Sequence, residues 1–450
     1  MSATPFPRNR ADLTPSLFDQ AVCAIGLILL WDALLSVMMS APSQRFILRA
    51  GGAPESSGDT IKQLIFAALY ATALLRIVML HGVRAFRYLS IPMALMVVLA
   101  IASSQWSHDP ALTIRRGVAL VGTTIFGLYV GLSYGEVALA RLIHRAVFVL
   151  AVLSALLAVG LPSYGLMPAE QGSQWRGVFS HKNGLGDAMA FGLTAGLFVL
   201  RSRPVTDSMA LVWRLGSFAI MAGCLAMSGS ATALIVAMAG MTLVLLVTHR
   251  QDAGSLALEL YGGALVVLLT AVFALLNLES IVGLLGRDIT LTGRTLIWDF
   301  AFRMIGQQPV LGYGFSAFWS GLDAPGALFW RTSGRFDIHA HNGFIQTTLD
   351  VGLLGLGLFA VAYVVYLSRI ARIVPVDRSG AARWHIVFAM MLVLGNVAES
   401  SLLIQNGLLW FLFTAFQARL SKTVHAYART PRPARRHRMT DGIPVAESRS

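Results

Sequence analysis

The chain alternates between long apolar blocks and shorter polar connections. Because a spanning helix needs about 20 consecutive apolar residues, the blocks predict about twelve transmembrane helices, with ten to twelve possible. They cover residues 18–40, 61–80, 88–104, 117–133, 145–162, 184–200, 210–227, 231–248, 258–276, 343–367, 384–399 and 404–418. They lack strict alternation and exceed the roughly 9–11 residues of a barrel strand. We therefore predict an all-α, polytopic integral membrane protein.

Composition leads to the same class. Of the 450 residues, 56% are hydrophobic and 13% are charged, whereas a soluble domain carries roughly 25% charged residues. These values exclude a water-soluble globular protein. The net charge of +13 is explained by basic cytoplasmic loops, and no compact basic domain exists that would bind nucleic acid.

Basic residues gather in alternate loops, which predicts that both termini are cytoplasmic. The expected division is a membrane bundle over 1–276, a large outer loop over 277–342, further spans over 343–418 and a tail over 419–450. The tail combines arginines with prolines, so we expect a disordered basic segment against the anionic inner leaflet. Cys23 and Cys224 lie in no metal-binding or redox motif and are expected to be buried thiols.

Residues 277–342 form by far the longest loop, and one part of it is amphipathic. Helical spacing relates Arg294, Ile297, Trp298, Ala301, Phe302 and Ile305, and the sequence Gln307-Gln308-Pro309 ends the predicted helix. Trp298, Trp319 and Trp330 are expected to be interfacial anchors. The loop should therefore lie on the membrane surface, where a lipid-linked substrate would be met.

The loop ends in His339-Ala340-His341-Asn342, directly before a span. A His-x-His pair suggests a metal, but no third ligand lies at a useful spacing and no cysteine is near, so we predict no metal site. A neutral imidazole at a membrane boundary suits proton transfer instead. The alternative is that His341 merely caps the following helix or sits at the interface.

Two groups of cations are candidates for binding an anionic substrate. Arg294 opens the amphipathic helix, and its guanidinium matches phosphate oxygens, although it could equally meet lipid headgroups. Arg176, His181, Lys182 and Asn183 precede another span. They could bind a diphosphate or sugar hydroxyls, or the two cations could simply snorkel to the interface.

Three acidic residues lie within or at the ends of predicted spans: Asp32, Asp187 and Glu399. Ionisable groups at membrane depth are functional candidates by default, because burying an unpaired charge is costly. Structural pairing with arginine or with the backbone is the alternative for Asp32 and Glu399.

Taken in order, the motifs resemble the O-antigen ligase and polymerase superfamily of bacterial envelope glycosyltransferases. The resemblance is carried by Gly293-Arg294-Thr295-Leu296-Ile297-Trp298, Pro309-Val310-Leu311-Gly312-Tyr313-Gly314 and His339-Ala340-His341-Asn342-Gly343-Phe344-Ile345-Gln346. The segment from Arg176 to Asn183 is similar to the exopolysaccharide-polymerase branch. The likeness covers about residues 165–355.

The resemblance implies an all-helical fold in the bacterial inner membrane with a large periplasmic loop. It implies a metal-independent glycosyltransferase, without cofactor, that uses glycans carried on undecaprenyl diphosphate. His341 would be the base that activates the acceptor hydroxyl, and Arg294 would hold the diphosphate. Arg176 and Lys182 would be auxiliary cations; His339, Asn342, His181 and Asn183 would contact sugar or orient the base.

One position departs from the family pattern. The family commonly has a cation where this chain reads Ser228-Gly229-Ser230-Ala231-Thr232, with Ala231 at that place. Polymerisation of oligosaccharide repeat units is the expected activity, with a glycan or lipid acceptor and a possible chain-length regulator as partners. The alternatives are an O-antigen ligase that transfers glycan to lipid A core, a transporter or flippase, and a non-catalytic scaffold.

Overall fold

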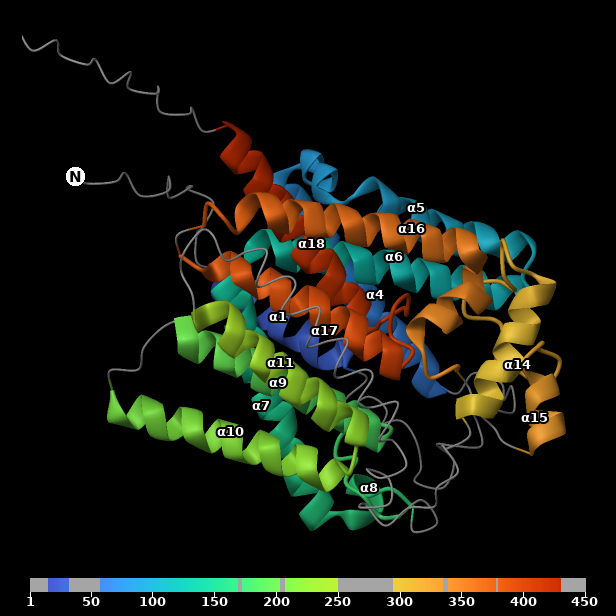
Figure 1. Ribbon diagram of the computed structural model, residues 1–450, viewed down its shortest axis with the longest axis horizontal. Coiled ribbons are helices and arrows are strands. Elements are labelled where there is room, and N and C mark those ends of the chain that lie inside the picture. Colours follow the sequence, from blue (N-terminus) through green and yellow to red (C-terminus); the bar gives the residue numbers. More distant parts are fainter. Residues whose placement is uncertain are drawn as a thin grey trace, which may run out of the picture.

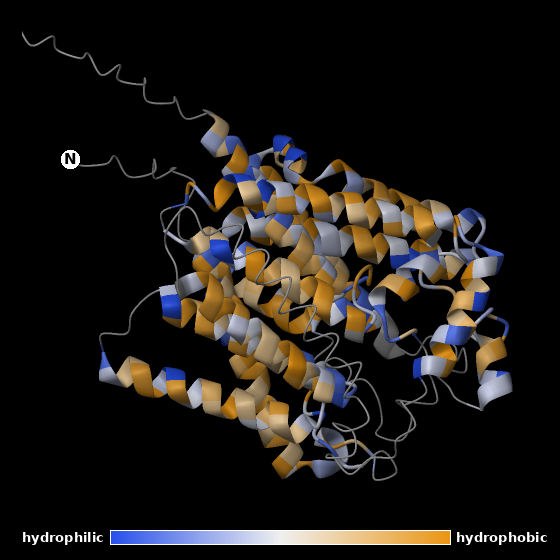
Figure 2. Ribbon diagram, in the orientation of Figure 1, coloured by the Kyte–Doolittle hydropathy of each residue, from blue (hydrophilic) through white to orange (hydrophobic). Residues whose placement is uncertain are grey.

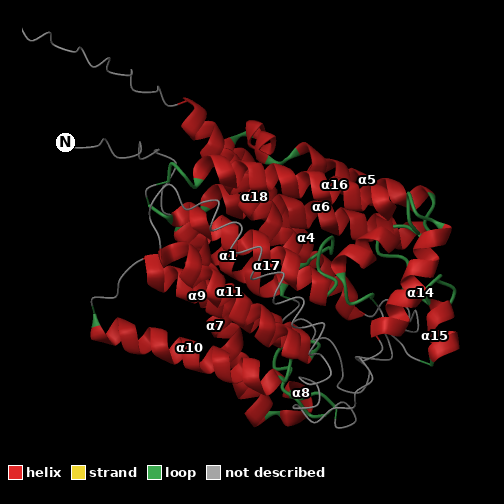
Figure 3. Cartoon of the chain, in the orientation of Figure 1, coloured by secondary structure: helices red, strands yellow, loops and turns green. Residues whose placement is uncertain are grey.

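The structure is a computed structural model that describes residues 15–31, 57–168, 172–202, 207–249, 294–334, 339–377 and 379–429. These ranges consist of helices and connecting loops (Figure 3), and their strand-like pairing is limited to one isolated bridge between Leu166 and Trp175. The predicted all-α class is confirmed. Asp32 and the predicted span 258–276 lie outside the described residues.

The helices follow the hydrophobic pattern closely. The long ones are α1 (Leu17–Leu30), α4 (Ser57–His81), α5 (Ile91–Ala102), α6 (Pro110–Ser133), α7 (Glu136–Gly160), α9 (Lys182–Ser202), α10 (Ser208–Ser228), α11 (Ala231–His249), α16 (Gly343–Ile373), α17 (Trp384–Ala398) and α18 (Leu408–Arg429). Shorter elements are η1 (Val83–Tyr88), η2 (Ser103–Gln105), α8 (Pro162–Gly165), α14 (Arg294–Gln307), α15 (Ala327–Ser333) and η5 (Ala381–Arg383).

Among the described residues, 7 helices are long and apolar enough to cross a membrane, and three shorter apolar helices accompany them. Figure 1 shows the long helices side by side in one bundle, with α14 and α15 beside it at one end. Figure 2 shows that hydrophobic residues run along these helices, whereas hydrophilic residues collect at their ends and near α14. A multi-pass membrane protein explains this distribution.

Close helix packing in the bundle depends on small residues. Helices α6 and α18 pack along their length, and a Cβ atom at Gly131 would collide with the backbone of Ala415. Small residues let membrane helices approach until their backbones touch. Aromatic side chains, including Phe126 stacked on Phe411 with ring centroids 5.2 Å apart, fill the remaining space.

The segment that contains α14 and α15 has its own core. Phe300, Phe318 and Phe329 pack there with Trp319 and Trp330, which are only 6% and 3% exposed. The expectation that Trp319 and Trp330 anchor the loop at the membrane interface is therefore wrong. Both indoles are buried within the segment, where they pack against other aromatic rings.

Helix α16 is interrupted, although its sequence predicts one continuous span. Val351 and Gly352 leave helical geometry, with φ of +70° at Gly352. The segment 309–314 pairs with the break: the Leu353 N–H donates to the Pro309 carbonyl at 2.8 Å, and the Tyr313 N–H donates to the Leu349 carbonyl at 2.8 Å. These hydrogen bonds satisfy the backbone groups that the break leaves unpaired, and they attach the segment that contains α14 and α15 to the bundle.

Candidate functional site

Three of the predicted site residues, Asn183, Arg294 and His341, meet at Glu399, which follows the last residue of α17. Its Oε1 accepts a 2.7 Å hydrogen bond from Asn183 Nδ2 and lies 3.4 Å from Arg294 Nη2. Its Oε2 lies 3.4 Å from His341 Nδ1. The three partners come from the starts of α9 and α14 and from the turn before α16. Arg294 and His341, which the resemblance assigns to one reaction, therefore face one common carboxylate, and the sequence alone did not identify Glu399 as that carboxylate.

The backbone at His341 has an unusual conformation, with φ of +51°. Such a left-handed geometry is unfavourable for a residue with a side chain, and it persists only where the surroundings impose it. Here the neighbouring Ala340 supplies the constraint: its carbonyl accepts from Trp298 Nε1 at 2.8 Å, and its N–H donates to Gln346 Oε1 at 3.0 Å. The position of the His341 imidazole is thus set from both α14 and α16.

His339 lies directly against His341. The His341 N–H donates to His339 Nδ1 at 3.3 Å, and the two ring centroids are 4.1 Å apart in an edge-to-face arrangement. Both imidazoles therefore lie on one side of the turn, next to Glu399.

Asn342 has a well-defined structural role. Its Oδ1 caps α16 by accepting from the N–H groups of Phe344 at 3.0 Å and Ile345 at 3.1 Å. Its own N–H donates to Ser400 Oγ at 3.0 Å, which ties the helix start to the segment that carries Glu399. These bonds explain Asn342 as an N-cap, and a sugar contact from it stays a prediction.

The predicted site residues before and at the start of α9 fall into two groups, one beside Glu399 and one in the loop that precedes the helix. Asn183 reaches Glu399, and its N–H donates to His181 Nδ1 at 3.2 Å, so both lie beside the site. Arg176 is buried and donates to the carbonyls of Tyr164 at 3.0 Å and Ser163 at 3.3 Å. Its guanidinium therefore holds together the loop before α9. The roles of Arg176 and of the buried Lys182 as auxiliary cations stay predictions.

Glu399 is ionised. Burial by itself would raise the pKa of its carboxyl, but contact with the His341 imidazole and the positive charge of Arg294 outweigh that effect and hold the pKa at about 2. A carboxylate charged at neutral pH can orient cations and stabilise a protonated imidazole.

The same residues also form a set of potential metal ligands. Within the described residues, one nitrogen each from His339 and His341 and a carboxylate oxygen of Glu399 lie within 4.8 Å of one another. Two imidazoles and a carboxylate are a donor set that suits zinc. Our prediction of no metal site assumed that a third ligand was missing, and Glu399 supplies one from a distant part of the chain.

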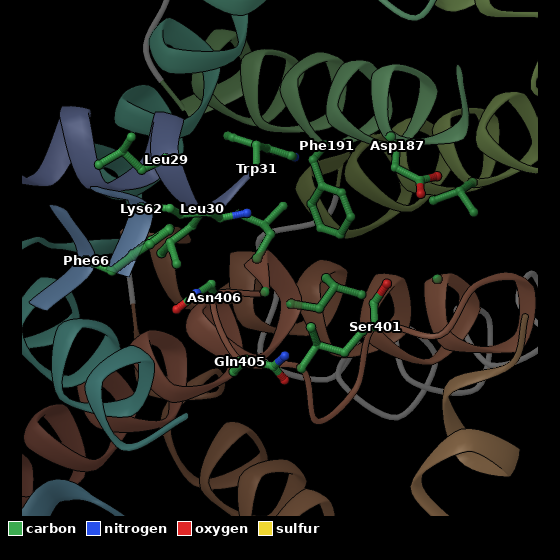
Figure 4. Close-up of a pocket in the computed structure, with 17 residues that line it drawn as sticks. Leu29, Leu30, Trp31, Lys62, Phe66, Asp187, Phe191, Ser401, Gln405 and Asn406 are labelled. Atoms are coloured by element: carbon green, nitrogen blue, oxygen red, sulfur yellow. The ribbon is translucent and has the colours of Figure 1, made fainter. Parts of the chain in front are cut away.

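A cavity of about 340 Å³ borders this cluster. It lies between the ends of α1, α4 and α9 and the loop before α18, and Asp187 reaches it one turn after Asn183 (Figure 4). Trp31 and Phe191 give it apolar walls, whereas Lys62 and Asn406 add polar groups. Asp187, predicted as a candidate from its depth in a span, thus lines a cavity next to the ionic site. Lys62, by contrast, was not predicted as a site residue from the sequence.

Ala231, the departure from the family pattern, begins α11 directly after Ser230. Gly186 of α9 packs so closely against Ser230 and Ala233 that an added side chain would touch both. Ala231 thus lies at a helix start that packs against the first turns of α9, and is itself partly exposed.

Comparisons with known proteins define the class. Residues 216–360 match the family described as O-antigen ligase. The exopolysaccharide production protein ExoQ of Rhizobium meliloti is 26% identical over 295 residues, which is 62% of this chain. A candidate polysaccharide ligase of Rickettsia typhi is 32% identical over 92 residues, and one of Rickettsia prowazekii is 35% identical over 83 residues, each covering 18% of this chain.

The fold defines a polytopic membrane protein, and these matches make it similar to proteins named for exopolysaccharide production and polysaccharide ligation. The match over residues 216–360 and the exopolysaccharide relative make the chain similar to the O-antigen ligase/polymerase-like superfamily. It spans 65% of the length of the exopolysaccharide relative and 20% of the length of each ligase relative.

Proposed function

We propose that the protein is a membrane glycosyltransferase that polymerises undecaprenyl-diphosphate-linked oligosaccharide repeat units at the periplasmic face. The observation that carries this proposal is the convergence of the Arg294 guanidinium and the His341 imidazole on Glu399. A phosphate-binding cation and a candidate base are thereby adjacent. Such a pair can supply the two functions that glycosyl transfer from a diphosphate needs, a base for the acceptor and a positive charge for the leaving group.

The reaction assigns one task to each group. The acceptor hydroxyl attacks the anomeric carbon, and the bond between that carbon and the diphosphate oxygen breaks with its electron pair. His341 takes the hydroxyl proton, because a sugar hydroxyl is a poor nucleophile while protonated. Arg294 stabilises the negative charge that develops on the departing undecaprenyl diphosphate. In this proposal Arg294 supplies the positive charge that a metal ion supplies in other transferases, so the enzyme needs no metal ion.

Polymerisation is favoured over ligation by the relative that covers most of this chain, which is an exopolysaccharide production protein. The ligase relatives align over much shorter stretches, so transfer of a finished glycan to lipid A core is the second candidate. The same proposal places the site in the periplasm, both termini in the cytoplasm, and the protein in the bacterial inner membrane. A glycan or lipid acceptor and a chain-length regulator would be its partners.

The test uses the full-length protein in liposomes with a lipid-linked repeat unit as donor. We expect His341→Ala and Arg294→Ala each to abolish chain lengthening while the protein still inserts. Arg303→Ala is the matched control, because Arg303 lies on the same helix as Arg294 but its side chain is 70% exposed and paired with Asp299. Normal polymer from the His341→Ala variant would refute the assignment of His341 as the base.

A deletion strain separates the two candidate activities. Loss of surface polymer with single-repeat material left on the carrier supports a polymerase. Full-length polymer that lacks its anchor supports a ligase.

A further inference from the structure

We propose that the cavity beside the ionic cluster binds one sugar unit of the lipid-linked glycan, with Asp187 as the group that holds its hydroxyls. This inference rests on the proposed function and deepens it, because it states where a sugar of the substrate lies. The cavity has a volume of about 340 Å³, near the lower end of the roughly 300–1,000 Å³ that is usual for ligand sites. A single sugar unit therefore suits it better than a long chain does.

Polar side chains line this cavity without partners in the protein. Asp187 reaches it from α9, and its carboxyl group has no hydrogen bond or ion pair within the described residues. Ser401 and Gln405 line the same space, and their side chains likewise have no hydrogen bond in the described part of the chain. A carboxyl group inside a membrane bundle is costly unless it is paired, and it marks a functional site by default. A ligand with hydroxyl groups would supply the missing partners.

Asn406 shows how a polar group at this cavity is fixed in place. Its backbone is left-handed, with φ of +57°, and its N–H donates to Thr123 Oγ1 at 2.9 Å. Its Oδ1 accepts from the Tyr70 hydroxyl at 2.5 Å. Helices α4 and α6 thus hold the residue, and its Nδ2 group, which has no hydrogen bond within the described residues, is left as a donor at the cavity. A donor that is already oriented costs little entropy when it binds a ligand.

The apolar walls complete the match to a sugar. Trp31, Phe66 and Phe191 line the cavity, and Figure 4 shows Asp187 and Phe191 projecting from α9 toward the loop that carries Ser401. A sugar ring has apolar C–H faces and a rim of hydroxyl groups, so it suits apolar walls with a few convergent polar groups. An isoprenoid chain has no hydrogen-bonding group and would leave the carboxyl group unpaired. The lipid part of the carrier is therefore the poorer fit.

The cavity and the ionic cluster share two elements. Asp187 lies one turn after Asn183 on α9, and Asn183 Nδ2 donates to Glu399 Oε1 at 2.7 Å. Ser401 lies two residues after Glu399. A sugar unit held by Asp187 would thus lie beside Arg294, where the bond to the diphosphate would break. In this role the carboxyl group binds and orients the ring, and it takes no part in proton transfer.

The first test separates sugar binding from a structural role. Asp187→Leu removes an unpaired carboxyl group, so we expect the Tm of the ligand-free variant in detergent to rise by a few degrees. A carboxyl group that holds the fold together would give the opposite result. Asp299→Leu is the matched control, because it makes the same substitution at a side chain that is 69% exposed and paired with Arg303.

Binding is measured by calorimetry on the purified full-length protein with two ligands. One is the repeat-unit oligosaccharide released from its carrier, and the other is undecaprenyl phosphate, which carries no sugar. We expect Asp187→Leu to weaken binding of the oligosaccharide about tenfold or more and to leave binding of undecaprenyl phosphate unchanged. Asp299→Leu should bind both as the wild type does.

Asn406→Asp tests the same cavity from its other wall. It keeps the oxygen that accepts from Tyr70 and removes the Nδ2 donor. We expect it to weaken binding of the oligosaccharide by a similar factor. This variant decides the question if Asp187→Leu does not accumulate in the membrane.

Kinetics in liposomes assign the bound sugar to the donor or to the acceptor. The lipid-linked donor is varied at a fixed concentration of released oligosaccharide as acceptor, and then the reverse. A higher KM for the donor in Asp187→Leu places the donor sugar in the cavity, and a higher KM for the acceptor places the acceptor there. Either result supports the inference.

Unchanged binding of the oligosaccharide in Asp187→Leu, or in Asn406→Asp where it replaces that variant, would overturn the inference. So would a lower Tm of Asp187→Leu, or a loss of undecaprenyl phosphate binding in its place. The two proposals fail separately. An active His341→Ala removes the proposed function, whereas an inactive His341→Ala together with normal oligosaccharide binding by Asp187→Leu removes only the sugar site.

Discussion

The indole Nε1 of Trp298 donates a 2.8 Å hydrogen bond to the carbonyl oxygen of Ala340, the residue before His341. Trp298 lies one turn after Arg294 on α14. The helix that carries the candidate phosphate-binding cation is therefore fastened to the turn that carries the candidate base. This single bond couples the two halves of the proposed site.

Trp298→Phe tests that coupling, because it keeps an aromatic ring and removes the donor. We expect a loss of about 1 kcal/mol in stability and about a tenfold fall in chain-lengthening activity, since the base loses its fixed distance from the cation. Trp213→Phe, on the exposed face of α10 at 67% exposure, is the control. Equal activity of the two variants would show that the bond does not align the site.

Arg294→Lys tests whether a positive charge at residue 294 is sufficient for activity without the guanidinium. A lysine keeps the positive charge but cannot present the planar fork that binds two phosphate oxygens at once. We expect kcat to fall by about 100-fold, with normal membrane insertion. Steady-state turnover of the lipid-linked donor measures this, and a lysine variant with wild-type turnover would rule out bidentate binding.

Gly343→Ala tests the packing beneath the base. A Cβ atom at Gly343 would collide with Asn396 Oδ1, and Asn396 cannot turn away, because its Nδ2 donates to the Leu392 carbonyl at 2.8 Å and its Oδ1 accepts from the Ser401 N–H at 3.1 Å. We expect a destabilisation of about 1–3 kcal/mol. Thermal unfolding in detergent should show a lower Tm, with Gly357→Ala, where nothing obstructs the added methyl group, as control.

Metal dependence gives a prediction of its own. Glu399 already faces Arg294 and Asn183, so a metal on His339 and His341 would have to compete with them for the carboxylate. We expect EDTA to leave activity unchanged and added Zn²⁺ to inhibit by occupying the base. Loss of activity with EDTA and its return with Zn²⁺ would instead assign these three residues to a metal centre.

The low pKa of Glu399 predicts how acid affects stability. Its pKa is depressed from 4.5 to about 2 in the folded protein, so its ionised form stabilises the fold above the unfolded value. That contribution declines as pH falls from about 4.5 toward 2. The Tm difference between wild type and Glu399→Gln should therefore be constant near neutrality and narrow at acid pH. A difference that grows in acid would have the wrong sign.

Hydrophobic periodicity was enough to place the helices. The predicted helix from Arg294 to the Gln307-Gln308-Pro309 stop matches α14, because an amphipathic stripe and a proline are local signals. The predicted spans inside the described residues likewise fall on helices, since about 20 apolar residues have few alternatives in a bilayer.

Long-range relationships were not predictable in the same way. Nothing near Glu399 in the sequence indicates that it bridges Arg294, His341 and Asn183, because that contact depends on how four distant segments pack. The buried Trp319 and the break at Gly352 were missed for a related reason. The hydrophobic pattern of an apolar block does not show whether its helix is continuous or interrupted. The presence of a tryptophan likewise does not show whether its side chain faces lipid or another aromatic ring.

The break in α16 limits how a substrate can reach the site. Four main-chain hydrogen bonds join residues 309–314 to residues 349–354, each worth roughly 1 kcal/mol. Moving this segment away from α16 would break all four bonds and leave their amide and carbonyl groups without these partners. Residues 309–314 should therefore move together with α16, so a substrate would not reach the site by parting this contact.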